Sequence, residues 1–301
     1  MSAQRTAEAA LDRYLVVGNP IAHSRSPEIH AAFARQTSQA MSYERLLVPL
    51  APAGEFARMV EAFFAGGGRG LNVTLPFKEQ AFAFARRHSA RAQLAGAVNT
   101  LALDGATVVG DNTDGPGLVT DLRGRLGFDP AGRSVLLLGA GGAARGVVMS
   151  LLQAGAASLT VANRTPAKAA LLADRFNASY ALREAGLPSV RATSLAAAER
   201  ADLIVNTTSS GVLGGELELP PALFAGCALA YDCVYAARPT AFMVQAQSGG
   251  AARCADGLGM LLEQAAESFL IWRAVRPETA PVYRMLRDAI SAQAAGAADA
   301  H

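Results

Sequence analysis

A glycine-rich segment near the middle of the chain constrains its fold most strongly. Residues 134–148 read SVLLLGAGGAARGVV, an apolar run followed by Gly139, Gly141 and Ala144 and then by a helix-like stretch. Glycines at the first two positions permit a tight turn and a close approach of a pyrophosphate, and a small third residue lets helix and strand pack closely. The segment predicts a Rossmann-type unit that binds a dinucleotide at a helix N-terminus. The expected contacts are Gly139, Ala140, Gly141, Gly142 and Ala143.

The end of the next predicted strand indicates which dinucleotide binds. The strand LTVANR, residues 159–164, ends without the Asp or Glu that would accept hydrogen bonds from a ribose 2′-hydroxyl. It is followed instead by a polar and basic group, namely Asn163, Arg164, Thr165 and Lys168. Cations and hydroxyls suit a 2′-phosphate, so these residues predict NADP as the cofactor rather than NAD.

The rest of the chain alternates between strand-like and helix-like segments. Runs rich in β-branched and apolar residues, at 14–18, 46–50 and 71–75, are separated by alanine-rich periodic stretches. This alternation predicts an α/β protein with mostly parallel sheets. One exception is residues 100–110, TLALDGATVVG, where Asp-Gly between alternating apolar positions predicts an antiparallel hairpin at the edge of the first sheet.

Composition excludes several classes of function. The chain has 301 residues, 51% of them hydrophobic, which is enough for two domains, and its net charge is only +2. We expect no nucleic-acid partner, because basic residues do not cluster with aromatic ones, and no membrane partner, because the apolar stretches are short. The charged start lacks an apolar signal region, and the three cysteines have no CxxC spacing. These features predict a cytoplasmic protein with no metal site.

Four short polar motifs occur at the ends of apolar runs before residue 116. They are HSRSP, NVTLPFK, AGAVNT and GDNTDG. Each has a structural alternative, since Ser26 before Pro27 is typical of a helix N-cap and Asp114 before a Gly-Pro pair could cap the next helix. Because strand ends in an α/β sheet meet at one edge, the four motifs together predict a single polar cleft.

The motif set resembles that of the shikimate dehydrogenase family. GNPIAHSRSPEIH, LNVTLPFKE, LAGAVNT, GDNTDG, GAGGAARG, NRTPAK, NTTSSG, YDCVY and ADGLGMLLEQAA follow the family's order between about residues 14 and 290. The resemblance implies reversible, NADPH-dependent reduction of 3-dehydroshikimate to shikimate, a step of aromatic amino acid biosynthesis. It also implies a substrate domain at 1–113, an inserted NADP-binding Rossmann domain at 114–256, and C-terminal helices at 257–301 that return to the first domain.

Individual residues take roles from the same resemblance. The substrate carboxylate is assigned to Ser24 and Ser26, and the ring to Asn72, Thr74, Lys78, Asn99, Asp114, Tyr235 and Gln264. The nicotinamide side is assigned to Cys233, Gly257 and Met260. Cys233 departs from the family pattern, in which larger residues are common at this position, so the packing there is left open. Met260 also fits a plain core position on an amphipathic helix.

Lys78 and Asp114 are the predicted catalytic residues. Lys78 is one of only two lysines among 27 basic residues, and the other is Lys168. Reducing a ketone to an alcohol needs a group that delivers a proton to oxygen, which lysine can do and arginine cannot. Asp114 could orient the lysine or share the proton, and the sequence leaves open which of the two transfers it.

Two alternatives compete with this interpretation. A quinate/shikimate dehydrogenase of broader specificity would be expected to carry an acidic residue where Asn163-Arg164-Thr165 stands. A non-catalytic NADP-binding regulator would be expected to lack Lys78 or Asp114, and both are present. The expected partners are a small-molecule substrate and NADP, and the oligomeric state is left open between monomer and homodimer.

Overall fold

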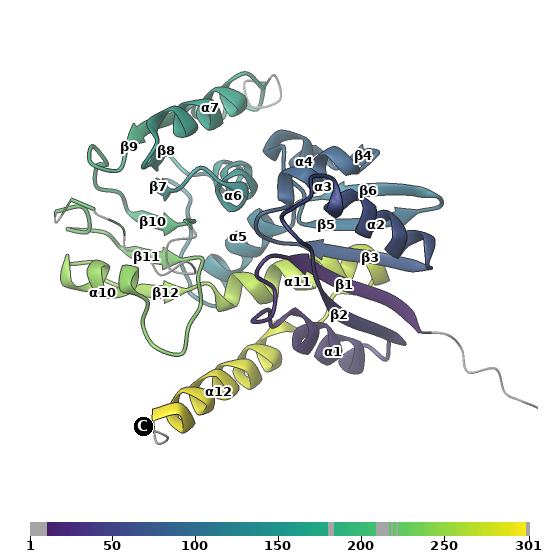
Figure 1. Ribbon diagram of the computed structural model, residues 1–301. Coiled ribbons are helices and arrows are strands. Elements are labelled where there is room, and N and C mark those ends of the chain that lie inside the picture. The colour runs from purple at the N-terminus through teal and green to yellow at the C-terminus, as the bar shows by residue number, and fades with distance from the viewer. Residues whose placement is uncertain (1–10, 180–183, 209–216, 218, 221, 299–301) are drawn as a thin grey trace, which may run out of the picture.

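The computed structural model describes residues 11–179, 184–208, 217, 219–220 and 222–298. Two six-stranded sheets lie side by side, each flanked by helices, with helices α5 and α11 between them (Figure 1). The α/β prediction is therefore confirmed, and most strand pairs are parallel.

The first sheet is built from the N-terminal part of the chain, in the order β2-β1-β3-β5-β6-β4. Its strands are β1 (Asp12–Gly18), β2 (Met41–Leu47), β3 (Gly68–Val73), β4 (Arg87–His88), β5 (Thr100–Asp104) and β6 (Thr107–Asp111). The predicted hairpin is present, because β5 and β6 pair antiparallel across Asp104 and Thr107. The prediction that this hairpin forms the edge of the first sheet is wrong. The two-residue strand β4 pairs with β6 and forms the edge instead.

Two local expectations in this domain also need correction. The strand expected at 46–50 is β2, which ends at Leu47 because the following Val48-Pro49 leaves the ladder and proline has no N–H to donate. The helix expected to be capped by Ser26 begins at that residue, and Arg25 occupies the N-cap. The helices of this domain are α1 (Ser26–Gln36), α2 (Glu55–Ala65), α3 (Lys78–Phe84) and α4 (Ala90–Ala95).

The second sheet has the order β12-β11-β10-β7-β8-β9, and all of its described pairs are parallel. Its strands are β7 (Ser134–Leu138), β8 (Ser158–Asn163), β9 (Val190–Ser194), β10 (Leu203–Asn206), β11 (Leu229–Asp232) and β12 (Cys254–Asp256). Its helices are α6 (Gly142–Gln153), α7 (Pro166–Asn177) and α10 (Ala241–Ser248). The strand order reverses at β7, so a ligand site is expected at the carboxyl end of that strand.

Among the described residues three further helices are found, and two of them link the sheets. They are α5 (Asp114–Gly124), α11 (Leu258–Arg273) and α12 (Thr279–Ala298). Helix α5 packs on both α6 and α11, and α11 buries Leu262 and Phe269 against Ile29 and Phe33 of α1. In Figure 1, α11 runs from the second sheet toward the first, and α12 projects away from both. Of the helices described, none combines the length and the apolar character needed to cross a membrane.

Candidate active site

Lys78 and Asp114 form a close ion pair between the two sheets. Lys78 is the first residue of α3 and Asp114 is the first residue of α5. The Lys78 Nζ atom lies 2.5 Å from Asp114 Oδ2, and the two side chains are only 15% and 6% exposed. Because little water screens the pair, its attraction is stronger than that of a surface salt bridge.

Asn99 holds the other oxygen of Asp114. Its Nδ2 donates to Asp114 Oδ1 at 2.8 Å and lies 3.3 Å from Gln264 Oε1, while its own Oδ1 accepts from the Thr113 backbone N–H at 2.8 Å. Asp114 therefore accepts hydrogen bonds on both carboxylate oxygens from different elements. Its orientation is fixed relative to Lys78, and four predicted residues, Lys78, Asn99, Asp114 and Gln264, meet at one point.

Asn72 lies beside this group in a second set of buried hydrogen bonds. Its Nδ2 donates to Ser268 Oγ at 2.9 Å and to Thr100 Oγ1 at 3.2 Å, and those two hydroxyls are themselves 2.7 Å apart. Ser268 and Thr100 were missed by the sequence analysis. Thr100 closes the quoted AGAVNT motif, and Ser268 follows Gln264 by four residues on α11, a spacing that places both on one helix face.

The predicted carboxylate residues lie at the start of α1. Ser24 Oγ donates to Ser26 Oγ at 3.2 Å and accepts from the Ser26 backbone N–H at 3.3 Å. Arg45 Nε donates to the Ser24 carbonyl at 2.8 Å and so supports this loop from β2. Burial raises the pKa of Tyr235, and the positive charge of nearby Arg25 partly opposes that rise, so the phenol lies at the same helix start.

Thr74 lies at the neighbouring end of β3. Its Cγ2 is so close to Gly18 that a Cβ atom on that glycine would approach it to 2.5 Å. The loops that follow β1 and β3 therefore pack directly on each other. Thr74 is half-buried and occupies the same edge of the sheet as Ser24 and Asn72.

The glycine-rich turn of the second domain touches the catalytic pair. Gly139 has φ of +108°, and a Cβ atom there would also approach Thr207 Oγ1 to 2.8 Å, so glycine is needed for both reasons. Gly141 is the N-cap of α6, and Ala140 and Ala143 flank it with half-buried side chains. A Cβ atom on Gly142 would lie 3.2 Å from Lys78 Cδ. The predicted phosphate turn and the predicted catalytic lysine are thus in direct contact.

The predicted 2′-phosphate residues lie together where β8 ends and α7 begins. Asn163 Nδ2 donates to the Thr165 carbonyl at 3.0 Å, which closes the turn between them. Thr165 is the N-cap of α7, and the side chains of Arg164, Thr165 and Lys168 are exposed. This surface could hold a phosphate through one guanidinium, one ammonium and one hydroxyl.

Cys233, Gly257 and Met260 also lie close together. Cys233 Sγ is 3.7 Å from Met260 Sδ, and a Cβ atom on Gly257 would approach the Cys233 carbonyl oxygen to 2.2 Å. Burial raises the pKa of the Cys233 thiol, so it stays protonated. The sequence left the packing around Cys233 open. In the structure its sulfur contacts Met260, whose side chain is 7% exposed.

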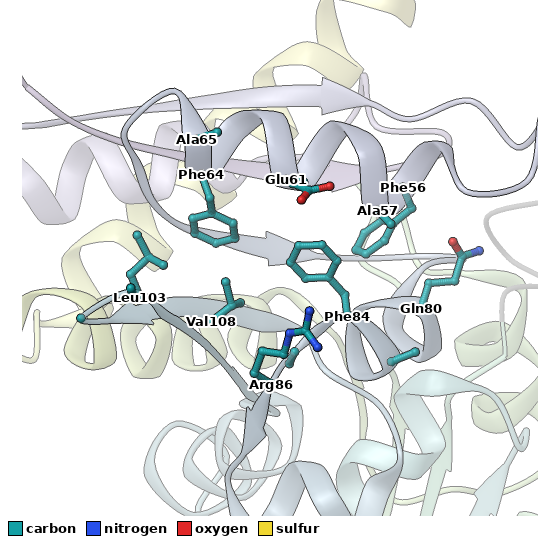
Figure 2. Close-up of a pocket in the computed structure, with 14 residues that line it drawn as sticks. Phe56, Ala57, Glu61, Phe64, Ala65, Gln80, Phe84, Arg86, Leu103 and Val108 are labelled. Carbon is teal, nitrogen blue, oxygen red and sulfur yellow. The ribbon is translucent and has the colours of Figure 1, made fainter.

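A separate pocket of about 980 Å³ lies in the first domain, between α2, α3 and the β5–β6 hairpin. Figure 2 shows Phe56, Phe64 and Phe84 around it, with the Arg86 and Glu61 side chains at its borders. It contains none of the predicted site residues. Among the residues that the structure describes, no group of His, Cys, Asp or Glu is arranged to hold a metal ion.

Comparison with known protein families covers most of the chain. Residues 16–101 match the "Shikimate dehydrogenase substrate binding domain", residues 125–212 match "Shikimate / quinate 5-dehydrogenase", and residues 257–287 match "Shikimate 5'-dehydrogenase C-terminal domain". The chain belongs to the shikimate dehydrogenase family. The suspected resemblance is therefore confirmed.

Individual relatives agree with the family match. The shikimate dehydrogenase (NADP(+)) of Bordetella petrii is 53% identical over 289 residues, which cover 94% of this chain and 98% of the relative. That of Dechloromonas aromatica is 51% identical over 276 residues, covering 92% and 97%. The match to these family members is nearly full-length on both sides.

Two solved structures are similar to this chain over most of its length. An Ael1 enzyme from Pseudomonas putida is 42% identical with a TM-score of 0.81, covering 91% of this chain and 98% of that one. Shikimate 5-dehydrogenase from Thermus thermophilus, solved in complex with NADP(H) and shikimate, is 35% identical with a TM-score of 0.77, covering 93% and 100%.

Proposed function

We propose that the protein is an NADP-dependent shikimate dehydrogenase, which reversibly reduces 3-dehydroshikimate to shikimate in aromatic amino acid biosynthesis. The observation that carries the proposal is the Lys78–Asp114 pair, 2.5 Å apart and in contact with Gly142 of the dinucleotide turn. A proton-transfer group and a cofactor-binding turn meet there, as a carbonyl reduction requires.

The substrate side follows from the chemistry of the cleft. We propose that Ser24 and Ser26 bind the substrate carboxylate at the start of α1, where backbone N–H groups favour an anion. The ring hydroxyls are assigned to Asn72, Thr74, Lys78, Asn99, Asp114, Tyr235 and Gln264. A wrong ligand would leave such buried donors and acceptors unpaired at about 1 to 3 kcal/mol each, which gives the site its selectivity.

The cofactor side uses the second sheet. NADPH supplies hydride when it is bound. We propose that Gly139, Ala140, Gly141, Gly142 and Ala143 accommodate its pyrophosphate, that Asn163, Arg164, Thr165 and Lys168 bind the 2′-phosphate, and that Cys233, Gly257 and Met260 form the nicotinamide side. The glycine-rich turn fits a bound pyrophosphate, because it has glycine at the positions where a Cβ atom would crowd a neighbour. These are Gly139, which faces Thr207, and Gly142, which faces Lys78.

Proton transfer is assigned to Lys78. Asp114 already accepts hydrogen bonds from Lys78 and Asn99, one on each oxygen, so it is placed to hold the lysine and not to donate. The Lys78 ammonium has three N–H donors, and Asp114 uses one. In the reducing direction Lys78 Nζ gives a proton to the substrate oxygen, and in the oxidising direction it takes that proton back.

We further propose the domain boundaries 1–113, 114–256 and 257–301, with the last segment returning to the substrate domain. Support comes from α11, whose Leu262 and Phe269 pack in one core with Ile29 and Phe33 of α1. A cytoplasmic location and a monomeric or homodimeric state are also proposed. The described Cys227, Cys233 and Cys254 are all free, which suits a reducing compartment.

The alternative of a broader quinate/shikimate dehydrogenase shares the same catalytic pair. The exposed Arg164 and Lys168 beside Asn163 favour NADP and therefore the narrower enzyme. The decisive assay adds shikimate with NADP, or quinate with NADP, or quinate with NAD, and follows the absorbance of the reduced cofactor. We expect turnover with shikimate and NADP to exceed both other pairings. Absence of turnover with every pairing would support the non-catalytic alternative.

The two lysines provide a matched test of the catalytic assignment. Lys78→Arg keeps the charge but cannot exchange the proton, so we expect the turnover number to fall by about a hundredfold or more, the size of a typical acid–base contribution. NADP binding should be nearly unchanged. Lys168→Arg is the control and should keep most activity, because a phosphate accepts either cation. A Lys78→Arg enzyme within a few-fold of the parent rate would refute the acid–base role of Lys78.

A further inference from the structure

Tyr43 lies between the two halves of the substrate site, although no sequence motif pointed to it. It is on the edge strand β2, and its hydroxyl donates to Asn72 Oδ1 at 2.7 Å. Burial raises the pKa of Tyr43 well above its usual value, and the nearby Ser26 side chain partly opposes that rise. The hydroxyl therefore stays protonated and lies between Ser26, at the carboxylate end, and Asn72, at the ring end.

The ring of Tyr43 is held in place by aromatic neighbours. His30 of α1 stacks on it with ring centroids 4.2 Å apart and an interplanar angle of 10°, and Trp272 of α11 contacts it at 6.2 Å. His30 is fully buried, and among the described residues neither of its ring nitrogens has a hydrogen-bond partner. Burial lowers the pKa of His30 to about 3, so the stacked ring is neutral. Strand β2, which carries Tyr43, and helices α1 and α11, which supply its aromatic neighbours, thus fix the direction in which the Tyr43 hydroxyl points.

The bond from Tyr43 completes the hydrogen bonding of the buried Asn72 amide. A side-chain amide has one acceptor oxygen and one donor nitrogen, and it can be turned end for end. Here Nδ2 donates to the Asn99 carbonyl at 3.2 Å, which sets the orientation of the amide, and Oδ1 then accepts from Tyr43. Asn72 is 5% exposed, so without the Tyr43 hydroxyl its Oδ1 would be left buried and unpaired, which is costly.

We infer that Tyr43 is a further substrate-positioning residue, whose hydroxyl fixes the Asn72 amide and links the carboxylate end of the site to the ring-hydroxyl end. The inference rests on the proposed function. Tyr43 acts through Asn72, and it takes no part in proton or hydride transfer. Its loss should therefore weaken recognition of a hydroxylated ring acid and leave the chemical step in place.

The test is Tyr43→Phe, which removes the hydroxyl and keeps the ring on His30. We expect the KM for shikimate to rise about tenfold, equivalent to about 1.4 kcal/mol. The KM for NADP and kcat should stay within about twofold, as expected for an interaction made equally in the ground and transition states.

Tyr14→Phe is the matched control. Tyr14 pairs in register with Tyr43 on the adjacent strand β1, and its ring lies 4.8 Å from the same Trp272. Its hydroxyl accepts from Arg273 Nη1 at 3.3 Å, away from the substrate residues. We expect this variant to keep the parent KM for shikimate. An equal rise in both variants would overturn the inference, because it would show a general effect of the aromatic cluster.

A double-mutant cycle with Asn72→Ala tests whether Tyr43 acts through the amide. If it does, Tyr43→Phe should raise the KM for shikimate by less than about twofold in the Asn72→Ala background. Full additivity, an unchanged KM in the single variant, or a fall in kcat alone would each overturn the inference. The unmodified protein must oxidise shikimate before these results can be interpreted. If it does not, the proposed function itself fails, which is a different result from a failure of the inference about Tyr43.

Discussion

At the scale of single residues, His30 is a histidine that the mechanism does not use. Its ring is fully buried among Phe33, Tyr43, Phe269 and Trp272. Burial lowers the pKa of His30 from 6.5 to about 3, although the nearby Asn72 side chain opposes part of the shift. The native protein therefore keeps this imidazole neutral at pH values where an unfolded chain would protonate it.

This difference predicts a pH-dependent loss of stability. Above pH 6.5 neither state is protonated at His30, and below it only the unfolded state gains a proton, so the free energy of unfolding falls until about pH 3. Between pH 7.5 and pH 5.0 the linkage amounts to about 2 kcal/mol. We expect His30→Phe to lose about 2 kcal/mol less than the parent over this interval in urea unfolding. Identical losses in parent and variant would contradict the buried neutral state.

Some residues of the site could be identified from the sequence and others could not. Lys78, Asn99 and Asp114 stand in distinctive motifs at strand ends, and the structure brings their side chains within hydrogen-bond distance. Tyr43 and Ser268 stand in segments that read as an ordinary strand and an apolar helix. Their positions depend on strand pairing and on the return of α11, which no local pattern encodes.

At the scale of elements, helices α5 and α6 are in very close contact. A Cβ atom on Gly115 would approach Ser150 Oγ to 2.3 Å, and one on Gly146 would approach Asn112 Oδ1 to 2.6 Å and Asp114 Cβ to 3.0 Å. The glycines let the helix that begins with Asp114 lie against the helix that begins at the dinucleotide turn. The catalytic pair and the cofactor site are thereby held at a fixed separation.

Gly146→Ala and Gly124→Ala form a matched test of this contact. We expect Gly146→Ala to lower the free energy of unfolding by about 1 to 3 kcal/mol, as overpacking does, and to reduce kcat by displacing Asp114. Gly124 is the exposed last residue of α5 with no atom within 4 Å of an added Cβ, so Gly124→Ala should stabilise by about 0.4 to 1 kcal/mol. Urea unfolding of both variants measures this. Equal free energies of unfolding in the Gly146→Ala and Gly124→Ala variants would show that α5 and α6 can move apart without cost.

Element boundaries were less predictable than element types. The glycine-rich turn, its strand and its helix were placed correctly from the sequence, because glycine spacing and apolar runs are local signals. The end of β2 was misplaced, because LLVPL reads as one apolar run and only pairing with β1 shows where the ladder stops. The hairpin was found, but its position inside the sheet depends on the remote two-residue strand β4.

At the scale of the whole molecule, the two sheets are joined by helices that pack between them. Helix α5 packs on α6 and on α11, and α11 returns to α1. Arg175 of α7 donates to the Leu94 carbonyl at 2.6 Å and to the Gln93 carbonyl at 2.7 Å, so it caps α4 of the first domain. These links imply that the two domains unfold together.

Trp272 can report this coupling, because it is the only tryptophan in the chain and it docks α11 onto the first sheet through a 3.0 Å bond from Nε1 to the Leu101 carbonyl. NADP at about a hundred times its dissociation constant should stabilise the native state by about 2.7 kcal/mol. If the domains unfold as one, urea midpoints from Trp272 fluorescence and from circular dichroism should rise together. NAD at the same concentration should shift both much less, because it offers Arg164 and Lys168 no 2′-phosphate. A Trp272 midpoint that stays fixed while the dichroism midpoint rises would show that the first domain unfolds independently.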